Sequence, residues 1–183
     1  MSQMFPSTTK KEQEILNLES RRKIYHLVKQ FSGCNFRELE RKSNIPRSTL
    51  YYHLHYLTKY QLITTQKDGN KIRYFTQNVL TKDKKILTFL RQKNIRHILL
   101  FILNHTECQQ KDIIHFLQLS PSTVFGYLSR LVTHHILQLI KKDRETYYCL
   151  AIEEKEIISL LITYKESFFD TLVEQTIDMW TFR

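Results

Sequence analysis

Ten side chains between residues 47 and 73 have the chemistry to bind a polyanion. Seven lie off the apolar stripe of a predicted helix: Arg47, Ser48, Thr49, Tyr51, Tyr52, His55 and Lys59. Three basic residues flank the turn that follows: Lys67, Lys71 and Arg73. Ser and Thr hydroxyls hold phosphate together with the N–H groups of a helix terminus, whereas Arg, Tyr and His reach base edges in a groove. The pattern predicts contact with nucleic acid; the alternative is an ordinary solvated helix face and hairpin.

A helix and a hairpin must position this cluster. Leu50, Leu54 and Leu57 recur at spacings of four and three, which predicts a helix from near Arg47 with one buried stripe. Residues 62–65 favour a strand, Asp68-Gly69-Asn70 supplies a tight turn, and residues 71–75 return as the second strand. Two further helices are predicted upstream, one capped by Ser20 and one over 36–42.

The same pattern recurs 74 residues later without a gap. Arg22 matches Arg96, and Cys34 matches Cys108. Asn94 is the expected cap of the second copy's first helix, and its hairpin turn lacks Gly, which predicts a looser or longer hairpin. The second copy presents its own candidate contacts: Ser122, Thr123, Phe125, Ser129, Arg130, Lys141, Lys142 and Arg144. Gly126 lies among them and is expected to permit close approach of a DNA or protein backbone.

These elements predict a mainly α protein with small β-hairpin wings, an α+β fold. The order of helix, short helix, turn, helix and hairpin resembles the winged helix-turn-helix unit over residues 15–78 and 89–152. The expected domains are therefore 1–80 and 81–152, two such units in tandem, followed by a helical extension over 153–183.

Two segments carry a resemblance to known regulators. The stretches "RELERKSNIPRSTLYYHLHYLTKYQLI" and "KDIIHFLQLSPSTVFGYLSRLVTHHIL" resemble ArsR-like and MarR-like regulators. Together with "LLITYKESFFDTLVEQTIDMW" they are similar to archaeal transcriptional regulators that hold two such domains in one chain. The resemblance implies a recognition helix in the major groove and a basic wing on the flanking backbone. The cysteine motif of metal-sensing ArsR members is missing from the third helix, so metal sensing is not implied.

Charge supports a polyanionic partner. The formal net charge is +10, and it divides into +8 over residues 1–80, +6 over 81–150 and −4 over 151–183. Such a distribution attracts nucleic acid first, an anionic membrane surface second and acidic proteins third.

Residues 153–180 are predicted as one continuous helix whose apolar face is wider than a single contact requires. Packing against its own domain accounts for half of that face, and the remainder predicts a homodimer. The expected dimer contacts are Ile157, Leu161, Tyr164, Phe168, Phe169, Leu172 and Trp180.

Several classes of protein are not indicated by the sequence. No GxGxxG, P-loop, GxSxG or HExxH motif occurs, so neither an enzyme nor a cofactor is predicted. His53 and His55, like His134 and His135, project from different helix faces, and no metal site is expected. The three cysteines are predicted to be small buried residues. No apolar run is long enough to span a membrane, and the first residues lack a signal-peptide core, which predicts a cytoplasmic protein.

The sequence thus predicts a transcriptional regulator that binds double-stranded DNA in a sequence-specific way and forms a homodimer. A tandem winged-helix scaffold that docks partner proteins is the alternative from another class. Duplex RNA is a weaker option, since its deep major groove does not admit a recognition helix. The sequence identifies neither the operator nor a small-molecule effector.

Overall fold

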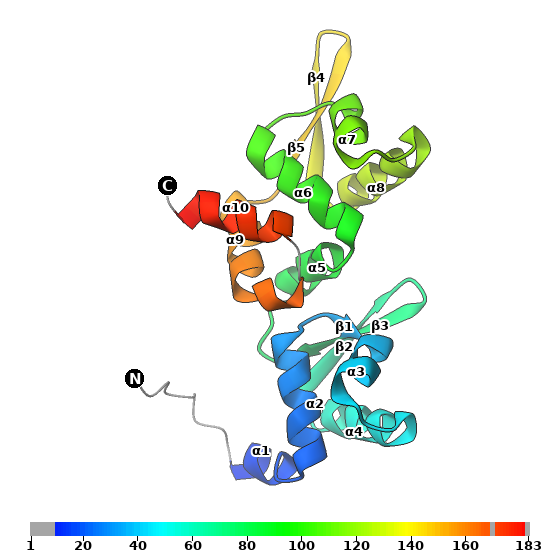
Figure 1. The fold of residues 1–183 in the computed structure, drawn as a ribbon, viewed down its shortest axis with the longest axis vertical. Helices are drawn as coiled ribbons and strands as arrows, with labels where there is room; N and C mark the ends of the chain where they lie inside the picture. The colour runs from blue at the N-terminus through cyan, green and yellow to red at the C-terminus, as the bar shows by residue number, and fades with distance from the viewer. Residues whose placement is uncertain (1–9, 169–170, 182–183) are drawn as a thin grey trace. The chain divides into compact units, whose positions relative to one another are not determined.

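The computed structural model describes residues 10–168 and 171–181, apart from the side chains of Thr171, Gln175, Trp180 and Thr181. It divides the chain into two compact units, 1–84 and 85–183. The described residues are mainly helical, with a three-stranded and a two-stranded antiparallel sheet (Figure 1). The predicted combination of mainly α-helices with small β-sheets is confirmed.

The first unit packs its helices on one small sheet. Its elements are α1 (Lys10–Ile15), α2 (Glu19–Gln30), β1 (Cys34–Asn35), α3 (Phe36–Ser43), α4 (Arg47–Lys59), β2 (Ile63–Asp68) and β3 (Lys71–Thr76). The strands lie in the order β1-β3-β2. Ile24, Leu39, Leu54 and Tyr74 are buried in one hydrophobic cluster, so α2, α3, α4 and β3 share one core.

Local sequence explains where α3, α4 and the first hairpin (β2–β3) begin and end. Asn35 caps α3 through a reciprocal bond with Glu38, and Asn44 ends the helix in the left-handed conformation. Pro46 then precedes the first turn of α4. Gly69 has a φ of +57° in the two-residue turn between Asp68 and Lys71, as the sequence predicts.

The second unit repeats this order and adds helices at both ends. Its elements are α5 (Thr81–Leu90), which begins in the first unit, α6 (Lys93–His105), α7 (Gln110–Leu117), α8 (Pro121–Thr133), β4 (Leu137–Lys142), β5 (Glu145–Leu150), α9 (Glu154–Thr163), η1 (Lys165–Ser167) and α10 (Thr171–Thr181). The bounds of α7, α8, β4 and β5 lie 74 residues after those of α3, α4, β2 and β3. Cys108 forms an isolated antiparallel β-bridge with Tyr148, and Cys34 pairs with Tyr74 in the same way between β1 and β3.

Two expected helix caps are wrong, and the second hairpin does not have the greater length that its lack of glycine suggested. The helix α2 begins at Glu19 after Leu18, and α6 begins at Lys93 after Gln92, so neither Ser20 nor Asn94 is a cap. The second hairpin (β4–β5) is no longer than the first, because Asp143 takes a φ of +54° without a glycine. Asp tolerates this conformation better than most residues.

The C-terminal segment is not one continuous helix, since α9, η1 and α10 are separate. Ile157, Leu161 and Phe168 are buried inside the second unit, which excludes them as dimer contacts. The guanidinium of Arg96 lies 5.3 Å from the centre of the Phe168 ring. Tyr164 and Leu172 are half-buried. Phe169 and the side chain of Trp180 lie outside the described residues.

The burial of the cysteines and the lengths of the helices bear on two further predictions. All three cysteines are free and buried, as predicted. Burial raises the pKa of the Cys108 thiol to about 12, so this thiol stays protonated at neutral pH. Within the described ranges, no helix combines the length and apolarity needed to cross a membrane.

His53 is expected to make the stability of the first unit depend on pH. Its side chain is 5% exposed, and its Nδ1 has no hydrogen-bond partner among the described residues. Burial, assisted by Arg21, lowers the pKa of His53 below 6.5. The unfolded state then binds more protons just below that pH, so unfolding free energy should fall on acidification by up to about 1.4 kcal/mol per pH unit.

Urea unfolding at neutral and mildly acidic pH checks this expectation. His53→Tyr, which introduces the residue found 74 positions later at Tyr127, should remove part of the pH dependence. His55→Tyr is the matched control, because His55 is exposed on the same helix. Equal pH dependence in wild type and His53→Tyr would exclude His53 as the cause.

Candidate nucleic-acid interface

A groove of about 1220 Å³ lies in the first unit between α3, the start of α4 and the first hairpin. Among the described side chains that line it, four are basic: Arg37, Arg41, Arg47 and Lys71. Glu38 is the acidic side chain among the described residues of this lining, and it is engaged in the cap of α3. We call this the cationic groove. Its charge and open form suit a linear polyanion.

Three elements each contribute part of the cationic groove. Arg37 and Arg41 are exposed and one turn apart on α3, so both project from the same helix face. Arg47 is the first residue of α4, 3.7 Å from a carboxylate oxygen of Glu40. Lys71 begins β3 and is exposed. The four cations therefore come from three elements that line one groove.

The exposed side of α4 adjoins the cationic groove. Ser48, Tyr52, His55 and Lys59 are exposed at spacings of four, three and four, and so form an outer stripe opposite the buried leucines. Tyr51 is also exposed, and it lines the groove together with Ser48. The sequence predicted all five of these residues as contacts, and the structure places them on one continuous surface of α4.

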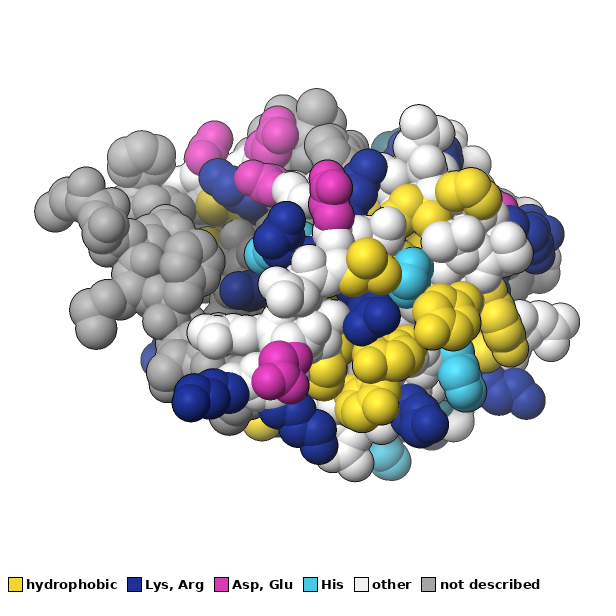
Figure 2. Space-filling model, turned by 90° about the horizontal axis from the view of Figure 1, so that it is seen from below, with side chains coloured by type: hydrophobic (Ala, Val, Ile, Leu, Met, Phe, Trp, Pro, Cys, Tyr) yellow, Lys and Arg dark blue, Asp and Glu magenta, His cyan; other side chains and the backbone are white. Residues whose placement is uncertain are grey.

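Aromatic rings stiffen one flank of the outer stripe. The Tyr52 ring lies 5.2 Å from the His53 ring and 6.3 Å from the Tyr56 ring, and Tyr56 lies 4.5 Å from Tyr60. The guanidinium carbon of Arg21 sits 4.0 Å from the centre of the Tyr56 ring. Figure 2, which views the end of the chain where α1, α2 and α4 lie, shows hydrophobic, basic and histidine side chains intermixed on one surface. Such packed rings lose little conformational entropy when they bind a ligand.

Arg73 does not belong to this surface, contrary to the sequence prediction. It is 3% exposed, and its Nε and Nη2 both donate to Asp68 Oδ2, at 3.0 and 2.9 Å. Its Nη1 donates to the carbonyl of Gly33 at 3.1 Å. Its guanidinium holds the first hairpin against the turn before β1 and is unavailable to a ligand.

Two other predicted residues of the first unit are not among those that line the groove. Lys67 is exposed on β2, and Thr49 is half-buried on α4. Arg37 and Arg41 were missed by sequence reasoning. The sequence does contain a signal for them. They are four residues apart in the short helix that precedes the predicted recognition helix, on the side opposite its apolar face.

The predicted contacts of the second unit are mostly exposed but partly engaged. Ser122, Thr123, Phe125, Lys141 and Arg144 are exposed, and Ser129 is half-buried. Arg130 Nη1 donates to Gln92 Oε1 at 3.2 Å, and Lys142 Nζ forms an ion pair with Glu107. A Cβ placed on Gly126 would meet nothing within 4 Å, so no close backbone approach explains this glycine within the unit.

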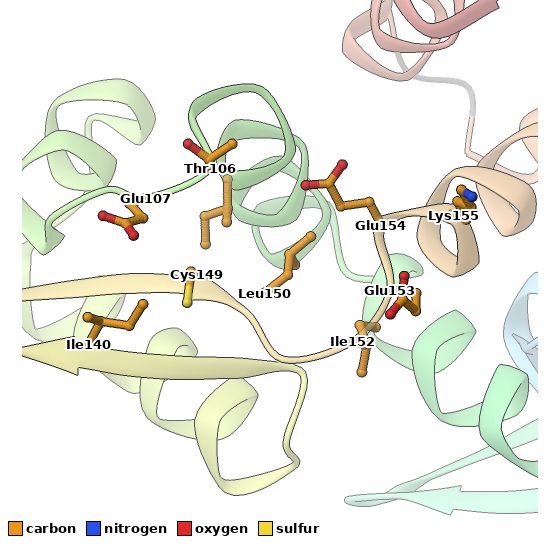
Figure 3. Close-up of a pocket in the computed structure, with 10 residues that line it drawn as sticks. Thr106, Glu107, Ile140, Cys149, Leu150, Ile152, Glu153, Glu154 and Lys155 are labelled. Carbon is orange, nitrogen blue, oxygen red and sulfur yellow. The ribbon is translucent and has the colours of Figure 1, made fainter.

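A cavity of about 470 Å³ lies in the second unit (Figure 3). It is lined by apolar side chains such as Ile140 and Leu150, with Glu107 and Glu154 among the polar ones. The Cys149 thiol in its lining donates to the backbone carbonyl of Gln138, with a sulfur–oxygen distance of 3.9 Å. The described residues hold no group of three or more His, Cys, Asp or Glu side chains suited to a metal ion.

Comparison with known proteins gives one informative match. No family model matches the chain. Over 138 residues the chain is 30% identical to an uncharacterized HTH-type transcriptional regulator of Methanocaldococcus jannaschii. The alignment covers 75% of this chain and 35% of the relative, so the chain spans about a third of that protein's length. Three quarters of the chain is therefore similar in sequence to part of a protein named as a helix-turn-helix regulator.

Proposed function

We propose that the chain is a transcriptional regulator that binds double-stranded DNA in a sequence-specific way and performs no catalysis. Each repeat is a winged helix-turn-helix domain, over 1–80 and 81–152, and residues 153–183 form an extension. The observation that carries the proposal is the cationic groove, which joins α3, α4 and the first hairpin in one basic surface. The similarity to an HTH-type regulator supports it.

The proposed docking divides the work between the outer stripe and the groove. The outer stripe of α4 enters the major groove, whose width accommodates an α-helix. The sugar-phosphate backbone beside it lies in the cationic groove, where Arg37, Arg41 and Lys71 neutralise phosphates. Backbone contacts then fix the register, and the stripe reads base edges.

Titration of a fluorescent DNA duplex at several salt concentrations tests this function. Log K should fall linearly with log salt because phosphate contacts release counterions. The double variant Arg37→Gln/Arg41→Gln should reduce the slope by about 2, since about 0.9 is lost per phosphate contact. An excess of duplex RNA should compete poorly.

Lys23→Gln/Lys29→Gln is the matched control. Both lysines are exposed on α2, outside the cationic groove, and their removal changes the net charge equally. If both double variants lower the slope by the same amount, binding follows net charge and the groove is not the site. If the wild-type protein does not bind duplex DNA at all, a scaffold that docks partner proteins becomes the better proposal.

We keep self-association as a second proposal, on a smaller surface than the sequence suggested. Ile162 of α9 and Met179 of α10 are large and about half exposed. Ile162→Lys/Met179→Lys should lower the mass seen by sedimentation velocity without unfolding the second unit. Truncation after residue 152 is unsuitable, since it would remove the buried Ile157 and Leu161.

A further inference from the structure

The groove positions of the two units differ in charge. The residues 74 positions after Arg37, Arg41, Arg47 and Lys71 are Lys111, His115, Pro121 and Glu145. With histidine neutral, the four positions carry +4 in the first unit and zero in the second. The element bounds coincide at this offset, so the comparison is between equivalent sites on α3 and α7, α4 and α8, and β3 and β5.

Glu145 replaces the cation of the first hairpin with a carboxylate held in place. Gln109 Nε2 donates to Glu145 Oε2 from the residue before α7, and Tyr147 Oη donates to the same oxygen at 2.7 Å. In the first unit the equivalent residues are Asn35 and Lys71, and both line the open groove. The second unit therefore has a hydrogen bond across the space where the first has a basic cleft.

This arrangement opposes phosphate at a position where the first unit carries a cation. The Tyr147 hydroxyl first, and Gln109 second, lower the pKa of the Glu145 carboxyl, so it remains charged at neutral pH. A phosphate placed there would meet a fixed negative charge. Lys142, a neighbouring cation of the same hairpin, is already paired with Glu107.

We infer that Glu145 closes the groove of the second unit to phosphate, and that the chain engages duplex DNA through its first unit alone. The inference rests on the proposed function, and it names which of the two repeats is the DNA-binding one. The exposed cations of the second hairpin, Lys141 and Arg144, then contribute nothing to DNA affinity despite their charge.

Three variants of the full chain test the inference in the same duplex titration. Lys71→Glu gives the first hairpin the carboxylate that the second hairpin carries at the equivalent position, and it should weaken binding more than tenfold. Lys141→Gln/Arg144→Gln should leave the affinity within twofold of wild type. Glu145→Lys should create a phosphate contact and raise the salt slope by about 1. Circular dichroism melting of each variant confirms that it is folded.

The outcomes separate this inference from the proposed function. Wild-type binding that is weakened by Lys141→Gln/Arg144→Gln as much as by Arg37→Gln/Arg41→Gln overturns the inference and leaves DNA binding intact. An unchanged salt slope in Glu145→Lys also overturns it, because the carboxylate is then not what keeps phosphate out. Absence of any wild-type binding instead rejects the proposed function itself.

Discussion

Asp68→Ala is expected to lower the unfolding free energy of the first unit by about 3 kcal/mol, the usual cost of removing one partner of a buried ion pair. The Arg73 guanidinium would keep the Gly33 carbonyl as an acceptor but lose two donated bonds to one carboxylate oxygen. Because Arg73 is 3% exposed, water cannot replace them without opening the hairpin. Urea unfolding followed by circular dichroism measures the effect.

The second unit provides the control. The residues equivalent to Asp68 and Arg73 are Lys142 and Tyr147, and the Lys142 ion pair with Glu107 is exposed. Lys142→Ala should therefore leave the unfolding free energy close to that of wild type. In the double variant Asp68→Ala/Arg73→Met no buried charge is left unpaired, so it should be more stable than Asp68→Ala. A single variant as stable as wild type would show that the pair does not hold the hairpin.

The parts of the fold that the sequence predicted well are those with strong local signals. The stripe of Leu50, Leu54 and Leu57 is buried on α4, and Asp68-Gly69-Asn70 forms the turn of the first hairpin. Periodicity and turn chemistry act within a few residues, so they can be read without knowing the tertiary fold.

The features that the sequence did not predict depend mainly on contacts between residues far apart in the chain. The strand β1 exists because Cys34 and Asn35 pair with residues about 40 positions away, which no local pattern reveals. Arg73 was predicted as a surface cation because basic residues are usually exposed, whereas Asp68 and the Gly33 carbonyl make its burial possible. The interruption between α9 and α10 contains neither Gly nor Pro, and so lacks the usual signals of a helix end.

The candidate site residues likewise divide into those with a local sequence signal and those whose role depends on tertiary contacts. Residues of the outer stripe were identified because they lie off a clear apolar stripe. Arg37 and Arg41 were overlooked because their role depends on α3 facing the first hairpin across a groove. The difference between Lys71 and Glu145 was visible in the sequence, but its meaning required the bonds that Gln109 and Tyr147 make to the carboxylate.

Tyr52→Ala is expected to reduce affinity for the preferred DNA site by about 1 to 3 kcal/mol, the range for a lost base contact, and to leave nonspecific binding almost intact. The tyrosine is 57% exposed in the centre of the outer stripe, with its ring supported by His53 and Tyr56. Lys71→Ala should behave differently, because a phosphate contact is shared by every sequence. It should weaken specific and nonspecific duplexes alike and reduce the salt slope by about 1.

Titrations on a duplex selected from a random library and on its scrambled form distinguish the two roles. Tyr60→Ala controls for loss of an aromatic ring, since Tyr60 lies at the far end of the same ring series, and Lys29→Ala controls for loss of one positive charge. Both controls should bind like wild type. If Tyr52→Ala weakens both duplexes equally, the stripe does not read bases. If Lys71→Ala leaves the salt slope unchanged, the phosphate backbone does not lie in the cationic groove, and a partner protein becomes the better candidate for that surface.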